Sequence, residues 1–209
     1  DVSTGSLILE SGGGSHANIL YDGGDIIGNV TAERELGVGP DWYFLTNPEG
    51  QTYDSFLRQG NANNLWIQGH SGSDASDASF ANTNLFEYNE PSDSSRANSW
   101  SRSEISGMSD APSRGEGFIT YVFTDDDNDG DGDGIPKTIN MEANPSTGTT
   151  FSSFPVTAND RPNNNFTGDT DDVIDAQEGW NLLGNPYLAN IQWTDVSKTN
   201  VDNPAYIYE

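Results

Sequence analysis

The stretch that decides the fold is FITYVFTDDDNDGDGDG, residues 118–134. Its first six residues, Phe118–Phe123, are β-branched or aromatic and carry no charge, which makes them the strongest strand candidate in the chain. An acidic, glycine-rich run follows them almost at once. The sequence therefore predicts a β-rich chain in which a long polar loop begins at the end of its best-buried strand.

Within the acidic run, carboxylates fall on alternating positions and glycines separate the later ones. Glycine lets the backbone turn tightly, so that the carboxylates can converge on one point. Hard cations such as Ca²⁺ take oxygen ligands of this kind, whereas Mg²⁺ dehydrates reluctantly and rarely sits in an all-protein cage. The alternative is a solvated, disordered charge run. We expect a structural Ca²⁺ site with the candidate ligands Asp125, Asp127, Asp129, Asp131 and Asp133.

The composition limits the classes of partner. The 209 residues include 33 acids but only 8 Lys and Arg, which gives a formal net charge of -25. Such a charge repels nucleic-acid phosphates and anionic lipid headgroups, so we expect neither nucleic acid nor a membrane as a partner. No apolar run approaches the ~20 residues that a membrane-spanning helix needs. The absence of cysteine excludes disulfides and zinc–thiolate sites.

Short apolar runs separated by Gly, Asn, Asp and Pro recur along the chain, and sustained helical periodicity is absent. Thr52–Leu57 is predicted as a single helical turn. Many short strands between such turns predict an all-β fold, an antiparallel β-sandwich resembling a jelly roll, with long polar loops. The predicted strands are Ser6–Glu10, Ala17–Tyr21, Val30–Leu36, Trp42–Thr46, Leu65–Gln68, Leu85–Tyr88, Phe118–Phe123, Lys137–Met141, Phe151–Val156, Gly179–Gly184, Ile191–Trp193 and Ala205–Tyr208.

We expect one β-sandwich module over residues 1–209, with the acidic calcium loop at 125–136. An alternative assigns residues 1–36 to a leading strand region of a preceding domain. The acidic, cysteine-free composition suits an extracellular setting, where millimolar calcium fills weak sites. We also expect the chain to be a segment of a longer secreted protein, with neighbouring domains as partners.

The tryptophans are the candidates for ligand contact. Trp42, Trp66 and Trp180 lie inside apolar strands and are expected in the core. Trp100 stands alone in a polar stretch, so it is the first candidate for an exposed contact, with Tyr88 beside it in a glycan-binding interpretation.

Catalytic machinery is not visible in the sequence. The two histidines, His16 and His70, lie in polar turns and are expected at the surface, and no nucleophile motif accompanies them. Glu116, or Glu87 with Glu90, could act as glycosidase acids, but 33 acids offer many accidental pairs. We therefore expect no enzyme.

Residues 129–136, DGDGDGIP, resemble the calcium-binding repeat of thrombospondin type 3 and of related bacterial surface proteins. The resemblance implies side-chain ligands at Asp129, Asp131 and Asp133, a sharp turn at Gly134 and a backbone carbonyl ligand at Ile135. Later acidic positions of that repeat hold Lys137 and Asn140 here, so the upstream Asp125 and Asp127 remain candidate ligands.

A second resemblance covers most of the chain. Several blocks, in order, are similar to β-rich modules of large Bacteroidota surface proteins exported by type IX secretion. The resemblance implies an exported protein, at the cell surface or released, and it carries no catalytic residues. The blocks are Ile27–Arg34, Trp42–Leu45, Leu65–Gly69, Gly115–Phe118 and Gly179–Tyr187.

Two functions follow from these observations. The first is a non-catalytic, calcium-stabilised extracellular module that acts in adhesion or as a structural spacer, with another surface protein as its partner. The alternative is a carbohydrate-binding module accessory to a polysaccharide-degrading enzyme, in which Trp100 and Tyr88 meet a glycan.

Overall fold

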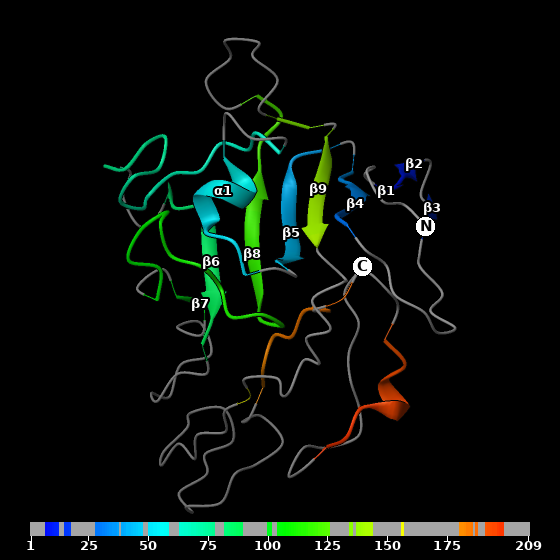
Figure 1. Cartoon of the computed structure of the whole chain (residues 1–209). Helices are drawn as coiled ribbons and strands as arrows, with labels where there is room; N and C mark the ends of the chain where they lie inside the picture. The colour runs from blue at the N-terminus through cyan, green and yellow to red at the C-terminus, as the bar shows by residue number, and fades with distance from the viewer. Residues whose placement is uncertain are drawn as a thin grey trace, which may run out of the picture.

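The structure is a computed structural model, and the description below concerns the residues that it places. These are residues 7–12, 15–17, 28–37, 39–47, 50–58, 63–77, 82–89, 100–101, 104–125, 134–135, 137–143, 156, 180–185, 187 and 191–198. The fold is mostly β with almost no helix, as predicted (Figure 1). Predicted strands Ala17–Tyr21, Phe151–Val156 and Ala205–Tyr208 lie wholly or almost wholly outside the described residues.

The larger sheet is antiparallel and is built around β8 (Gly117–Val122), which corresponds to the strongest predicted strand. β8 pairs with β5 (Asp41–Thr46) on one side and with β6 (Leu85–Tyr88) on the other. A two-residue strand, β7 (Trp100–Ser101), extends the sheet beyond β6. Within the described residues, β5 pairs only with β8 and is therefore an edge strand of this sheet.

The smaller sheet is mixed, so the predicted antiparallel pairing is wrong for this sheet, because strand direction depends on pairing between segments distant in the sequence. β4 (Val30–Glu35) pairs in parallel with β1 (Leu7–Leu9) and antiparallel with β9 (Thr138–Ala143). Val30 and Ala32 are buried and Glu35 is exposed, because successive side chains of a strand point to opposite faces of the sheet. Two short strands, β2 (Ser11–Gly12) and β3 (Ser15–His16), form a separate antiparallel pair.

One helical turn covers the buried face of the larger sheet. α1 (Tyr53–Leu57) begins where the Thr52 side chain accepts a hydrogen bond from the Ser55 amide, so the predicted turn is confirmed. The Tyr53 and Phe118 rings meet edge-on at 5.2 Å between centroids, and α1 lies across β6 and β8 in Figure 1. A 3-10 turn, η4 (Trp193–Asp195), replaces part of the predicted strand Ile191–Trp193.

Both sheets contribute to one hydrophobic core. Leu36 and Ile139 come from the region of the smaller sheet, whereas Leu45, Leu85 and Phe118 come from the larger one. Full burial of a side chain of this size contributes about 1.5–3 kcal/mol. The half-buried Arg34 adds a polar link, because its guanidinium donates to the carbonyl of Phe44 in β5 at 3.1 Å. Within the described residues, no helix is long and apolar enough to cross a membrane.

Residues 63–77 form tight turns held by buried polar side chains. The ring of His70 contacts the Leu85 carbonyl through Nε2 at 2.9 Å, and Asn84 donates to the carbonyls of Trp66 and Tyr121. His70 is only 3% exposed, so the predicted surface position is wrong. Backbone groups that lack sheet partners must be satisfied inside the protein, and polar side chains meet that need here.

Residues 180–185 return to the larger sheet. Leu183 forms an isolated antiparallel bridge with Glu116, and the Gly184 amide donates to the Gly115 carbonyl at 3.0 Å. A Cβ added at Gly184 would lie 2.2 Å from the Cβ of Thr46, so this contact requires glycine. The predicted strand at Gly179–Gly184 is therefore a single bridge in the described residues.

Candidate functional site

The two ends of the acidic loop meet at the end of β8. The amide of Ile135 donates to the carbonyl of Phe123 at 2.9 Å, and the Ile135 side chain belongs to the shared core. A Cβ added at Gly134 would come within 1.7 Å of the carbonyl oxygen of Thr124. Only a residue without a side chain fits where the loop returns.

Asp125 is the one predicted aspartate ligand that the structure describes. Its Oδ1 is buried and has no hydrogen-bond partner in the described part of the chain. Leaving such an oxygen unsatisfied costs about 1–3 kcal/mol or more. A bound cation would supply the missing partner, so the donor chemistry of Asp125 fits a calcium ligand.

The remaining aspartates of the predicted site, Asp127, Asp129, Asp131 and Asp133, lie outside the described residues. In the described ranges, no three or more His, Asp or Glu side chains gather in a way that could hold a metal ion. The complete ligand set, including the proposed carbonyl ligand at Ile135, stays a prediction.

The structure brings Tyr88 and Trp100 together. They face each other across β6 and β7, with ring centroids 5.2 Å apart and planes at 76°. Trp100 also approaches Phe44, at 6.0 Å between centroids. Trp100 is half-buried in a short strand, so its predicted isolation in a polar loop is wrong.

The strand register places both residues on a larger aromatic surface. Trp42 is opposite Tyr121, and Phe44 and Phe86 are both opposite Ile119. Directly opposed residues of antiparallel strands point to the same face of a sheet. We call the resulting surface the aromatic face; its rings are Trp42, Phe44, Phe86, Tyr88, Trp100 and Tyr121.

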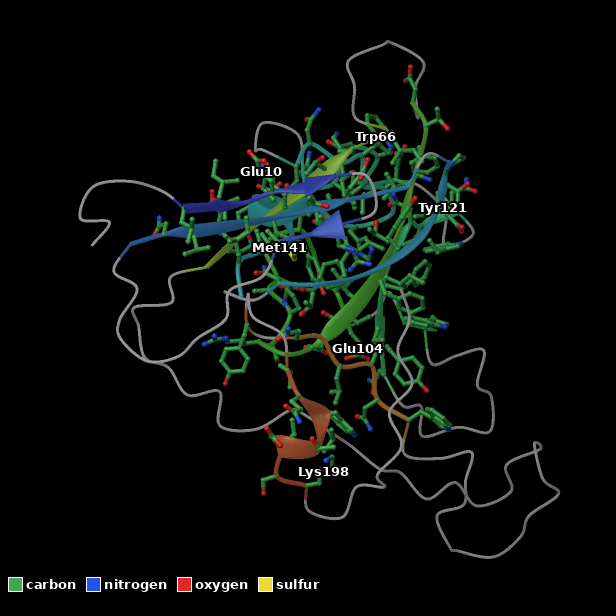
Figure 2. All side chains as sticks on the ribbon, turned by 90° about the vertical axis from the view of Figure 1, so that its right-hand side faces the viewer. Glu10, Trp66, Glu104, Tyr121, Met141 and Lys198 are labelled. Atoms are coloured by element: carbon green, nitrogen blue, oxygen red, sulfur yellow. The ribbon has the colours of Figure 1, made fainter. Side chains whose placement is uncertain are left out.

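The aromatic face lies on the side of the larger sheet away from the core. Trp42 is 42% exposed and packs against Phe86 and Tyr121, with centroids 5.8 and 5.4 Å away. Figure 2 shows Tyr121 on the opposite side of β8 from Met141, which packs against the core. The predicted core position of Trp42 is therefore wrong, because its side chain lies on the face of β5 opposite to that of the buried Leu45.

Glu87 is a half-buried carboxyl on the opposite, core-facing side of β6. The hydroxyl of the buried Tyr53 donates to its Oε1 at 2.5 Å. Burial raises the pKa of Glu87 to about 6, and the negative charges of Glu116, Glu104 and Asp110 add to this effect, although the Tyr53 hydrogen bond opposes it. The sequence offered Glu87 only as one of many acids, since its partner Tyr53 is distant in the chain.

We expect Glu87→Gln to change the pH dependence of stability. The folded-state pKa is raised, so the wild type has extra stability below about pH 4.5 and loses it as pH rises through about 6. Solvent screening limits the loss to roughly 1 kcal/mol. The glutamine variant keeps an acceptor for Tyr53, so its stability relative to wild type should rise by that amount between pH 4.5 and 6, measured by urea unfolding. A difference that stays constant from about pH 4 to 8 contradicts this assignment.

Comparison with known proteins adds no family assignment: no protein-family model, curated protein or solved structure matches the chain. The ends of the acidic loop and the aromatic face are therefore the features that indicate a function.

Proposed function

We propose that the protein is a non-catalytic, calcium-stabilised extracellular module of a secreted or cell-surface bacterial protein, acting in adhesion or as a structural spacer. The proposal rests on the two ends of the acidic loop, which meet at the end of β8. At one end the buried Oδ1 of Asp125 lacks a hydrogen-bond partner among the described residues. At the other end Ile135 is buried, and its amide donates a hydrogen bond to the carbonyl of Phe123.

The position of the loop explains what calcium would stabilise. The loop follows β8, the central strand of the larger sheet, and precedes β9 of the smaller sheet. A connection of this length costs conformational entropy, and like charges along it repel one another. Bound Ca²⁺ would neutralise the carboxylates and hold the connection between the two sheets. The ion then acts on the stability of the fold and takes no part in a reaction.

The finer fold and the setting belong to the same proposal. Two sheets that share one core support a β-sandwich, and we assign it a jelly-roll-like order. The net charge of -25 and the lack of cysteine support an extracellular location in a calcium-rich medium. The similarity to type IX-secreted Bacteroidota modules supports export, with neighbouring domains or another surface protein as partners.

Removal of calcium should lower the melting temperature. Extracellular modules bind calcium with Kd values of about 10⁻⁴–10⁻³ M, so ~10 mM Ca²⁺ reaches up to about 100 times Kd. Mass action then adds up to about 2.7 kcal/mol, which corresponds to roughly 5–10 °C for a chain of this size. Melting is followed by circular dichroism in Ca²⁺, in EDTA, and in Mg²⁺ at matched ionic strength.

Asp125→Asn is the informative variant, because it keeps the size of the side chain and removes its charge. We expect it to lose at least half of the calcium-dependent shift. Asp77→Asn makes the same charge change at an exposed turn and should keep the full shift. Equal melting temperatures in Ca²⁺ and EDTA would contradict the proposal. An equal shift in Mg²⁺ would show that the cations act only by screening the net charge.

Carbohydrate binding is the second candidate function, and the juxtaposition of Tyr88 and Trp100 supports it. The two predicted contact residues are paired across neighbouring strands, and further rings of the same sheet surround them. Aromatic rings combine a large apolar surface with a polar group, which suits the apolar faces and hydroxyls of sugars. The calcium site would then support an accessory module of a polysaccharide-degrading enzyme.

A further inference from the structure

We infer that the aromatic face binds an extended, electrically neutral glycan chain, and that Trp42 is its principal stacking residue. This inference rests on the second candidate function and specifies the class of ligand. It adds Trp42, which was expected in the core, to the predicted contact residues. It also excludes anionic polysaccharides, which a calcium-dependent module could otherwise bind through the ion.

The charge pattern of the face selects the class of ligand. None of the positions that β5, β8, β6 and β7 give to this face holds Asp, Glu, Lys or Arg; the charged strand residues Asp41 and Glu87 fall on the other face. The chain as a whole carries -25. Sulfated or uronic-acid chains would approach against this field and find no cation on the face. A neutral polyhydroxylated chain meets no such barrier.

The same charge argues against a second copy of the chain as the occupant, because two molecules at -25 repel each other. The most exposed ring, Trp42, offers a broad apolar surface and is 42% exposed. Tyr121 and Phe86 pack against this ring and restrict its orientation. A rigid aromatic side chain loses little conformational freedom on binding.

The arrangement of rings indicates a chain rather than a single sugar. Trp42, Tyr121 and Phe86 form one group, and Tyr88, Trp100 and Phe44 form another. Both groups take rings from β5 and β6, and Phe44 and Tyr88 each lie two residues along their strand from Trp42 and Phe86, so the groups are spaced about 7 Å apart along the strands. A monosaccharide would cover one group only, whereas an oligosaccharide would reach both.

The test is affinity electrophoresis of the full chain in calcium, through gels that contain a neutral, an anionic or a cationic polysaccharide, at two salt concentrations. We expect retardation by at least one neutral polymer such as a β-glucan, xylan or mannan, insensitive to salt. Oligosaccharides should relieve it and monosaccharides should not. Trp42→Ala should weaken binding at least 10-fold and Trp42→Phe less. Tyr187→Ala removes an equally exposed ring outside the face and should change nothing.

The outcomes distinguish carbohydrate binding in general from a preference for neutral glycans. Stronger, specific retardation by an anionic or cationic polymer at high salt overturns the neutral class while keeping carbohydrate binding. Retardation by no polymer in a broad panel overturns both carbohydrate binding and this inference. Light scattering completes the test, because a dimer that Trp42→Ala dissociates would assign the face to a second copy. Thermal melting checks that each variant is folded, and the calcium-dependent melting shift remains a separate test of the first function.

Discussion

Gly69→Ala is expected to lower the free energy of unfolding by about 3 kcal/mol or more. Gly69 has φ +89°, in a region that residues with a side chain rarely adopt. A Cβ there would also lie 2.1 Å from Oγ1 and 3.0 Å from Cα of the buried Thr83. The strained backbone costs about 1–2 kcal/mol, and the overlap in a closed interior adds about 1–3 kcal/mol.

Gly72→Ala is the matched control for this prediction. Gly72 has a similar φ of +78°, but its added Cβ would meet only Met108 at an ordinary 3.9 Å. We expect a loss of roughly 1 kcal/mol in urea unfolding, from the backbone alone. An equal loss of stability in both variants would show that Gly69 is not packed closely against Thr83.

Gly134→Ala is expected to cost about 3 kcal/mol and to weaken the response to calcium. The added Cβ would overlap backbone atoms, at 1.7 Å from the carbonyl oxygen and 2.1 Å from the carbonyl carbon of Thr124. The loop end must then move away from β8. That movement breaks the hydrogen bond from Ile135 to Phe123, worth about 1 kcal/mol, and displaces a buried isoleucine worth about 2 kcal/mol.

The control is Gly39→Ala, because an added Cβ at Gly39 meets nothing within 4 Å. This variant should stay within about 0.5 kcal/mol of wild type and keep the full calcium-dependent shift in melting temperature. A Gly134→Ala protein with wild-type stability and calcium response would show that the loop does not return against Thr124.

Local sequence pattern was sufficient for the elements that depend on neighbouring residues. The run Phe118–Phe123 predicted β8, Val30–Leu36 predicted β4, and Leu85–Tyr88 predicted β6 with its observed bounds. The helical turn predicted at Thr52–Leu57 corresponds to α1, which Thr52 caps. These features arise from side-chain periodicity and capping within a few residues.

Features that depend on long-range pairing were missed. A strand that is apolar on both faces shows neither its position in the sheet nor which face the core covers, so the position of β5 and the exposure of Trp42 could not be inferred. Trp100 reads as a loop residue because β7 is only two residues long. His70 was predicted at the surface because its acceptor, the carbonyl of Leu85 in β6, is distant in the sequence.

The candidate sites divide in the same way. Asp125 was predicted from the alternation of carboxylates, and the sharp turn at Gly134 was implied by the resemblance to the calcium-binding repeat; both signals are local in sequence. The pairing of Tyr88 with Trp100, and the extension of that pair to Trp42, required the register of four strands. A search of aromatic alternation within β5 could have suggested that Trp42 and Phe44 share a face, but not which rings join them.

The calcium site at Asp125 can be tested by a calcium titration of the chelator-stripped chain. Binding is measured by isothermal calorimetry, with Asp125→Asn and Asp77→Asn run in parallel. The proposal predicts saturable binding with Kd at or below about 10⁻³ M in wild type and in Asp77→Asn. Asp125→Asn should bind at least 10-fold more weakly, through loss of a charged oxygen ligand. Absence of saturable binding in wild type, or equal affinity in all three proteins, would contradict a calcium site built on Asp125.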